Sequence, residues 1–250
     1  MGRSVTLFTG QWADLPLETV CKKAVDFGYD GLELACWGDH FDVFKGAESK
    51  AYCDEKHALL AKYGLKTWAI SNHLAGQLIC DPNNDKRSDG FAPADCAGNA
   101  EKKRQFGIKS MKAAAKAAKN LGVKVVPGFT GSPIWQYIYS FPPNDWAEIE
   151  AGYARFAELF VPILDEFKAN GVKFALEVHP TEIAYDLVTF ERALKAVNGH
   201  PAFGINFDPS HLYWQMMDPE EFVYAYGDRF DRWLAPLSVL AATDDGGVFR

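Results

Sequence analysis

Short apolar runs alternate with longer amphipathic stretches along this sequence. The apolar runs indicate strands, and the stretches between them repeat apolar positions every three or four residues, as helices do. The predicted strands are 5–9, 31–37, 66–72, 124–129, 173–178 and 203–207, and the predicted helices are 17–25, 49–63, 103–121, 146–169, 187–197 and 219–226. Strict alternation of strands and helices predicts a parallel sheet in an α/β fold.

The two faces of each predicted strand differ in character. In the strand 173–178 the bulky side chains of Phe174 and Leu176 alternate with the small or polar ones of Ala175 and Glu177. A doubly wound sheet is covered by helices on both faces, so both of its faces should be apolar. A barrel packs large residues outward onto helices and can place polar groups inside, near its mouth. We therefore predict a TIM (β/α) barrel.

The number of units falls short of a complete barrel. Six βα units are recognisable in the sequence, whereas a TIM barrel has eight. We expect one domain over 1–250, with an incomplete or atypical C-terminal closure and an atypical tail at 227–250. Residues 233–242 are apolar enough to cover an open sheet edge or to form a makeshift seventh strand. The polar stretch 75–100 is too long for a plain connector, and we expect it as a loop over the barrel mouth.

Composition and charge exclude several classes of function. Lys and Arg total 26 against 33 Asp and Glu, and a net charge of -7 argues against nucleic-acid binding. No stretch approaches the roughly 20 apolar residues that span a bilayer, and no signal peptide is recognisable. The five cysteines form no CxxC pair, which is typical of reduced thiols in a cytosol. We expect a cytoplasmic protein without a membrane or nucleic-acid partner.

Glu177 and Asp208 are the strongest candidate functional residues. Each lies on the inward face at the predicted C-terminal end of its strand, where barrel active sites form. Two carboxylates that meet there repel each other unless a cation lies between them, and a divalent ion would satisfy both. The alternative is that each carboxylate caps the helix that follows it or pairs with a basic residue.

Three histidines accompany these acids. His211 follows Asp208 across a proline that disfavours helix at Asp208, so the chain turns there. Its imidazole could bind the metal, bond a substrate oxygen, or simply cap a helix. His179 lies two residues after Glu177 and shares its face, and His73 has the same placement after the third strand. Each of these two is either a site residue or a buried histidine with a structural partner.

Two further candidates lie near the second strand. A buried carboxylate at Glu33 is costly without a partner, so Glu33 either supports the site or pairs with a basic group. Trp37 ends the predicted strand 31–37 next to a βα loop, where its ring could form an apolar wall against a sugar or simply pack. The sequence contains no GxGxxG, GxxxxGK[ST], HExxH or GxSxG motif, which disfavours dinucleotide, P-loop, zincin and hydrolase-elbow functions.

Three runs resemble a known family. Leu-Glu-Val-His-Pro from Leu176 and Ile-Asn-Phe-Asp-Pro-Ser-His from Ile205 are similar to paired motifs of the sugar phosphate isomerase/epimerase family of xylose isomerase-like TIM barrels. The run from Gly31 to His40 resembles the family's second strand and loop. The similarity extends from about Val5 to Gly227. These motifs are specific to the superfamily and not to one substrate.

The resemblance implies a metal site and assigns it residues. In the family a divalent metal, often manganese, is held by Glu, Asp, His and Glu from four strand ends. The first two ligands fall on Glu177 and Asp208, and His211 matches a histidine that contacts substrate in epimerases and binds metal in apurinic endonucleases. The expected substrate-binding residues are His179, His73, Glu33, Trp37 and His40. No His follows His211 and no Glu follows Glu221, so two family ligands lack a counterpart, and we interpret this as truncation or frameshift.

The resemblance implies a metal-dependent sugar isomerase or epimerase. Glu177 would move a proton next to a carbonyl, and the cation and His211 would stabilise the cis-enediolate of a sugar or keto-sugar. Mn²⁺ is the expected cofactor, with Mg²⁺, Co²⁺ or Zn²⁺ as alternatives. A keto-sugar or keto-inositol dehydratase or lyase, an inactive truncated barrel, and an apurinic endonuclease remain alternatives. Because open sheet edges favour association, we expect a homo-oligomer.

Overall fold

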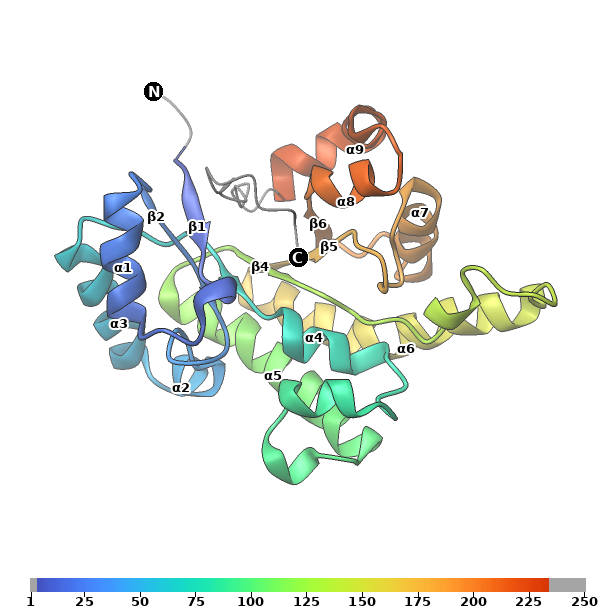
Figure 1. Ribbon diagram of the computed structural model, residues 1–250, viewed down its shortest axis with the longest axis horizontal. Helices are drawn as coiled ribbons and strands as arrows, with labels where there is room; N and C mark the ends of the chain where they lie inside the picture. The colour runs from blue at the N-terminus through green and yellow to red at the C-terminus, as the bar shows by residue number, and fades with distance from the viewer. Residues whose placement is uncertain (1–3, 234–250) are drawn as a thin grey trace.

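In the computed structural model, which describes residues 4–233, six short parallel strands follow one another in chain order (Figure 1). They are β1 (Thr6–Phe8), β2 (Gly31–Ala35), β3 (Ile70–Ser71), β4 (Val125–Gly128), β5 (Lys173–Glu177) and β6 (Phe203–Asn206). The strands pair as two parallel sheets, β1-β2-β3 and β4-β5-β6. A parallel bridge between Ala69 and Val125 joins the two sheets, so the strands form one curved wall.

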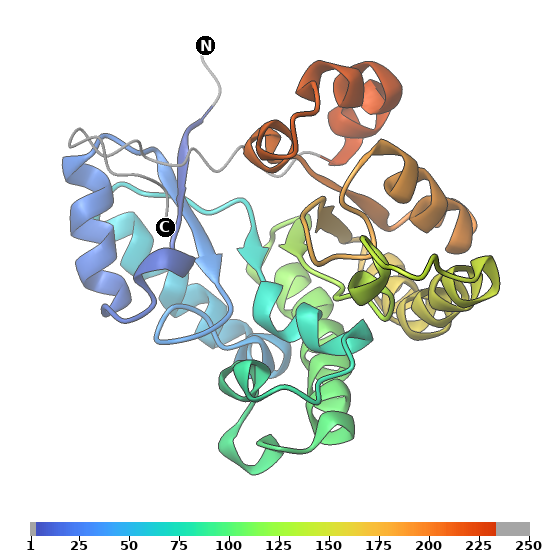
Figure 2. The same ribbon diagram turned by 45° about the vertical axis from the view of Figure 1, so that its right-hand side comes forward.

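Helices connect the strands and cover the outer side of this wall (Figure 2). They are α1 (Leu17–Asp26), α2 (Val43–Glu48), α3 (Lys50–Lys62), α4 (His73–Cys80), α5 (Ala100–Leu121), α6 (Trp146–Asn170), α7 (Leu187–Ala196), α8 (Pro209–Trp214) and α9 (Pro219–Trp233). Four 3-10 turns lie at Gly10–Trp12, Lys86–Phe91, Ala94–Cys96 and Trp135–Tyr137. No helix within residues 4–233 is long and apolar enough to cross a membrane.

The predicted α/β class and the order of elements are confirmed. The six strands form part of a barrel wall, and within the described residues no strand closes it from β6 back to β1. The predicted cover or seventh strand at 233–242 lies outside the described residues, apart from the last residue of α9.

The outward faces of the strands are apolar, as their alternation predicted. The ring of Phe174 on β5 lies 5.5 Å from that of Phe160 on α6. On β6, the ring of Phe203 stacks on Phe190 of α7 at 5.8 Å with an interplanar angle of 11°. All four side chains are fully buried, so this packing fixes the strands and leaves their polar faces turned inward.

The excursion predicted at 75–100 is present after β3, but its first residues form a helix and not a loop. β3 is only two residues long, and His73 begins α4 directly after it, so His73 lies on a helix and not on a strand. The rest of the segment carries two 3-10 turns and is bound to α5. Lys103 of α5, which is 1% exposed, donates to the carbonyl oxygens of Asn83 and Asp85. The segment is therefore packed structure, because its polar groups pair with α5.

Candidate active site at the strand ends

Three of the predicted residues converge at the C-terminal ends of β5 and β6. Glu177 is the last residue of β5, Asp208 is the N-cap of α8, and His211 lies in α8. One carboxylate oxygen or ring nitrogen of each lies within 4.8 Å of those of the other two. Asp208 also caps α8 through Oδ1, which accepts from the Ser210 N–H at 2.8 Å. Two oxygen donors and one nitrogen donor at such distances can hold a single divalent cation.

Glu177 accepts hydrogen bonds from three side chains. Oε2 accepts from His73 Nε2 at 2.9 Å and from Asn206 Nδ2 at 3.0 Å, and Oε1 lies 3.1 Å from His211 Nε2. Burial raises the pKa of Glu177, but the hydrogen bonds and charges of His211 and His73 outweigh it and hold that pKa well below its usual range. Glu177 therefore stays a carboxylate, as a metal ligand requires.

His211 lies between the two acids. Its Nε2 is 3.4 Å from Asp208 Oδ2 as well as 3.1 Å from Glu177. Burial lowers the pKa of His211, but the hydrogen bond to Glu177 and the charge of Asp208 raise it further than burial lowers it. The imidazole is thus readily protonated and can donate a hydrogen bond to a developing negative charge.

His179 packs edge-on against His211, with ring centroids 4.1 Å apart and an interplanar angle of 75°. Its Nδ1 bonds the carbonyl oxygen of Pro180. Burial and the neighbouring His211 lower the pKa of His179, so its imidazole is neutral at physiological pH. Within the described part of the chain its Nε2 has no hydrogen-bond partner, which leaves that nitrogen for a substrate oxygen.

Aromatic rings surround this polar group. The ring centroids of Trp37, Phe8 and Phe129 lie 6.4 Å, 5.5 Å and 4.7 Å from that of His73. The sequence pattern singled out Trp37 but not Phe8 or Phe129. Their positions at the end of β1 and directly after β4 are the signal that could have found them. The rings form an apolar wall beside the carboxylates.

Glu33 lies deeper, on β2, and is 2% exposed. Its Oε1 accepts from the Ser71 hydroxyl, and its Oε2 has no partner among residues 4–233. Burial raises the pKa of Glu33 to about 7, partly offset by the Ser71 hydrogen bond and the charge of His73. Of the two alternatives, pairing with a Lys or Arg is not observed in the described structure. Glu33 instead lies close enough to His73 and Glu177 for their charges to act on its pKa.

His40 has a different place from the one predicted. Its side chain is fully buried, with Nδ1 bonded to Thr9 Oγ1 at 2.9 Å and Nε2 to the Leu15 carbonyl oxygen at 3.0 Å. Both ring nitrogens are used within the protein, so the structure does not support a substrate contact for His40. Asn206, which sequence reasoning did not select, is a site residue, because its side chain donates a hydrogen bond to Glu177. Its inward parity on β6 matches that of Glu177 on β5.

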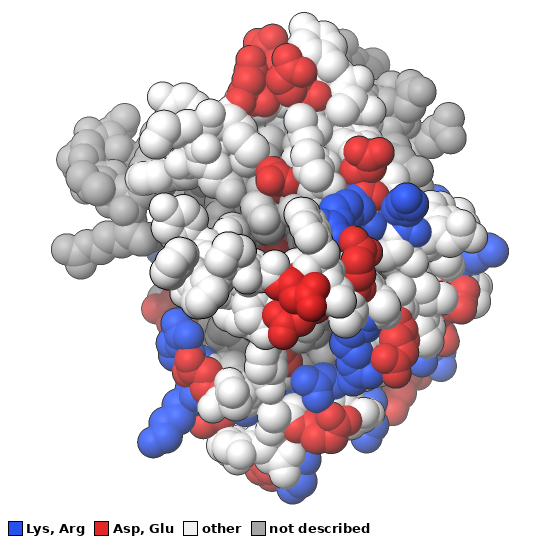
Figure 3. Space-filling model, turned by 90° about the vertical axis from the view of Figure 1, so that its right-hand side faces the viewer, with Lys and Arg blue, Asp and Glu red and all other residues white. Residues whose placement is uncertain are grey.

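The charges on the face that carries α6 and α7 are mixed. Figure 3 shows Lys and Arg interspersed with Asp and Glu, with no continuous basic stripe on the visible part of this face. Binding to a phosphate backbone depends on such a stripe.

Comparison with known proteins gives a family match and one curated relative. A family model described as a xylose isomerase-like TIM barrel matches residues 21–234. The uncharacterized protein YfiH of Bacillus subtilis (strain 168) is 26% identical over 269 residues, which cover 95% of this chain and 77% of that protein.

Solved structures share the fold at low sequence identity. The probable 3-DHS dehydratase AsbF from Bacillus anthracis is 18% identical with a TM-score of 0.62, over 91% of this chain and 70% of that one. The 3-keto-D-glucoside 4-epimerase YcjR from E. coli is 13% identical with a TM-score of 0.62, over 97% and 84%. The IolI protein with a bound zinc atom is 18% identical with a TM-score of 0.56, over 91% and 70%. At these identities the likeness concerns the fold alone.

Proposed function

The chain belongs to the xylose isomerase-like TIM barrel family, and from this premise we propose that it is a divalent-metal-dependent sugar isomerase or epimerase. The reaction would transfer a proton next to a carbonyl group through a cis-enediolate. The observation that carries the proposal is the convergence of Glu177, Asp208 and His211, whose ligand atoms lie within 4.8 Å of one another at the strand ends.

The donor set suits a hard or borderline cation. Glu177 and Asp208 offer oxygen and His211 offers nitrogen, which Mn²⁺ accepts, as do Mg²⁺, Co²⁺ and Zn²⁺. The similar IolI structure contains a zinc atom, and this supports the proposal of a divalent ion here. When bound, such an ion polarises a substrate carbonyl and acidifies the adjacent C–H group.

The side chains of the site can divide the proton-transfer work among them. Glu177 would take the proton at Oε1 and return it, while His73 and Asn206 hold its Oε2 and fix the carboxylate plane. As the alternative to binding the metal, a protonated His211 would donate from Nε2 to the enediolate oxygen. Neutral His179 would bond a hydroxyl, and Trp37, with the rings beside it, would cover the apolar side of the sugar.

The same site suits a second reaction class. A keto-sugar or keto-inositol dehydratase or lyase would use the same abstraction at Glu177 and then expel a leaving group at the neighbouring carbon. The likeness to the probable dehydratase AsbF favours keeping this candidate. We also propose a cytoplasmic location, supported by five free cysteines, and a homo-oligomer of this chain.

Deuterium exchange tests the proposal. The protein would be incubated in D₂O with Mn²⁺, Mg²⁺, Co²⁺ or Zn²⁺ and a panel of ketohexoses and keto-glycosides, and the sugars would be followed by NMR. We expect deuterium at the carbon next to the carbonyl, with an epimer or isomer as product, and loss of exchange in Glu177→Gln. Loss of water or of an aglycone would assign the lyase class. No exchange with any metal or sugar would contradict both and leave an inactive barrel.

A further inference from the structure

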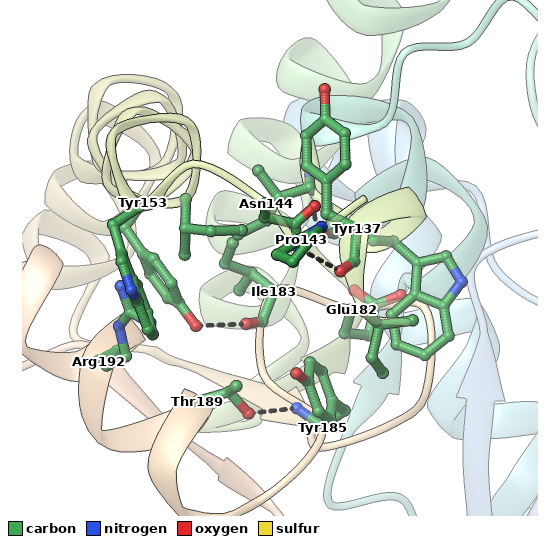
Figure 4. Close-up of a pocket in the computed structure, with 15 residues that line it drawn as sticks. Tyr137, Pro143, Asn144, Tyr153, Glu182, Ile183, Tyr185, Thr189 and Arg192 are labelled. Carbon is green, nitrogen blue, oxygen red and sulfur yellow. Dashed lines mark hydrogen bonds between the residues drawn. The ribbon is translucent and has the colours of Figure 1, made fainter. Parts of the chain in front are cut away.

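A cavity of about 380 Å³ lies between α6 and α7. Figure 4 shows its lining, which comes from the segment after β4, the start of α6, the loop between β5 and α7, and α7 itself. Neither Glu177 nor Asp208 nor His211 lines it. It is therefore separate from the candidate active site, and its volume falls in the range of pockets for small ligands.

Aromatic side chains make up much of the wall. They are Trp135, Tyr137, Trp146, Tyr153 and Tyr185. The rings of Trp135 and Tyr185 meet edge to face with centroids 5.5 Å apart. Flat rings of this kind pack against the C–H faces of a sugar ring while their polar edges reach its hydroxyls.

Glu182 is a buried carboxyl group in the lining of this cavity. It is 1% exposed, and its Oε2 accepts from the backbone N–H groups of Thr130 and Gly131, each at 2.7 Å. Its other oxygen, Oε1, is buried without a hydrogen-bond partner in the described chain. A buried polar atom left unpaired costs free energy, and a ligand hydroxyl in the cavity would satisfy it.

The charges around the cavity favour an uncharged ligand. The guanidinium of Arg192 lies 4.5 Å from the centre of the Tyr153 ring, and Nη2 pairs with Glu150 at 2.6 Å. This cation already covers the aromatic face, so it opposes a cationic ligand. Burial raises the pKa of Glu182 to about 8, so at neutral pH its carboxyl group is neutral and offers no charge to a cationic ligand. The charge of Arg192 is already paired with Glu150, which weakens its attraction for an anionic ligand.

We propose that this cavity is an accessory carbohydrate site that binds one uncharged pyranose ring. The ring would pack on Trp135 and Tyr185, with a hydroxyl bonded to Oε1 of Glu182. The candidate active site would not take part in this binding.

Binding of methyl β-D-glucopyranoside tests the site by saturation-transfer NMR on the sugar protons. We expect saturable binding to the wild-type chain, about tenfold weaker binding to Trp135→Leu through loss of the ring contact, and a smaller loss in Tyr185→Phe. Tyr139→Leu is the matched control. Tyr139 lies in the same segment between β4 and α6 as Trp135, is 99% exposed and does not line the cavity. Its affinity should equal that of the wild type.

Glu177→Gln separates this proposal from the proposed reaction. We expect the variant to bind the glucoside as the wild type does while its deuterium exchange is lost. Absence of binding to the wild type, or unchanged affinity in both Trp135→Leu and Tyr185→Phe, would overturn the accessory site. Loss of binding in Glu177→Gln would also overturn it, because the sugar would then occupy the active site.

Discussion

Nε2 of His73 lies 2.9 Å from Oε2 of Glu177, and this hydrogen bond joins residues 104 positions apart in the sequence. His73 begins α4 after β3, whereas Glu177 ends β5. The bond therefore connects the two three-stranded sheets at the site. It also orients the carboxylate of Glu177, because with Oε2 bonded to His73 the other oxygen, Oε1, faces His211.

We expect His73→Leu to lower the rate of deuterium exchange by about a hundredfold, since Glu177 loses the donor that fixes its carboxylate. His73→Gln, which can still donate to Oε2, should recover part of the rate. NMR exchange rates at saturating sugar and metal measure both variants, with thermal melting as a check on folding. Equal loss in the two variants would mean that the imidazole does more than donate one hydrogen bond.

The inward parity of β5 and β6 was enough to predict that Glu177 and Asp208 meet. Parallel strands end at the same edge of a sheet, so residues of equal parity on neighbouring strands come together. Asn206 has the same inward parity on β6, but parity alone does not identify its contact with Glu177. Contacts between loops follow no such period, which is why the burial of His40 and the pairing of Glu182 with the segment after β4 could not be predicted.

Residues 75–100 show a second reason why the sequence pattern did not predict the structure in full. Their polar composition predicts a loop, yet the polar groups are paired with one buried cation on α5. Lys103 forms an ion pair with Asp89 and donates to Ser88 Oγ at 2.9 Å. Hydrophobic periodicity carries no signal for such a polar pairing, and so pattern reasoning could not find it.

Lys103→Met tests this cation. We expect it to lower the free energy of unfolding by about 3 kcal/mol, because Asp89 and the carbonyl groups around it lose their partner. Lys102→Met is the matched control. Lys102 is the exposed neighbour of Lys103, so its substitution should change the free energy of unfolding by less than about 0.5 kcal/mol. Urea unfolding followed by circular dichroism measures both. Similar stability of the two variants would show that water replaces the Lys103 contacts at no cost.

Gly131 and Gly122 allow a test of close packing at matched backbone angles. Their φ values are +66° and +82°, so alanine is strained at both. A Cβ at Gly131 would lie 2.3 Å from the Gln77 carbonyl oxygen, whereas nothing lies within 4 Å of one at Gly122. We expect Gly122→Ala to cost about 1 kcal/mol of unfolding free energy and Gly131→Ala to cost clearly more. Equal costs in urea unfolding would mean that the segment after β4 moves freely away from α4.

The buried carboxyl of Glu182 predicts a pH dependence of stability. Burial, as the largest cause, raises its pKa in the fold from 4.5 to about 8. The folded state thus binds this proton more tightly than the unfolded state. The stabilisation is complete below about pH 4.5 and is lost as the pH rises through about 8.

Glu182→Gln removes this titration and keeps an oxygen that accepts from Thr130 and Gly131. We therefore expect the unfolding free energy of the variant, relative to wild type, to increase from about pH 5 to about pH 9, by an amount on the order of a few kcal/mol. Glu158→Gln, on the exposed side of α6 with 68% of its side chain accessible, is the control and should follow the wild type across this range. Urea unfolding at several pH values gives the three curves. A Glu182→Gln curve parallel to the wild type would mean that Glu182 binds its proton equally in the folded and unfolded chain, and that its Oε1 finds a partner by rearrangement of the loop.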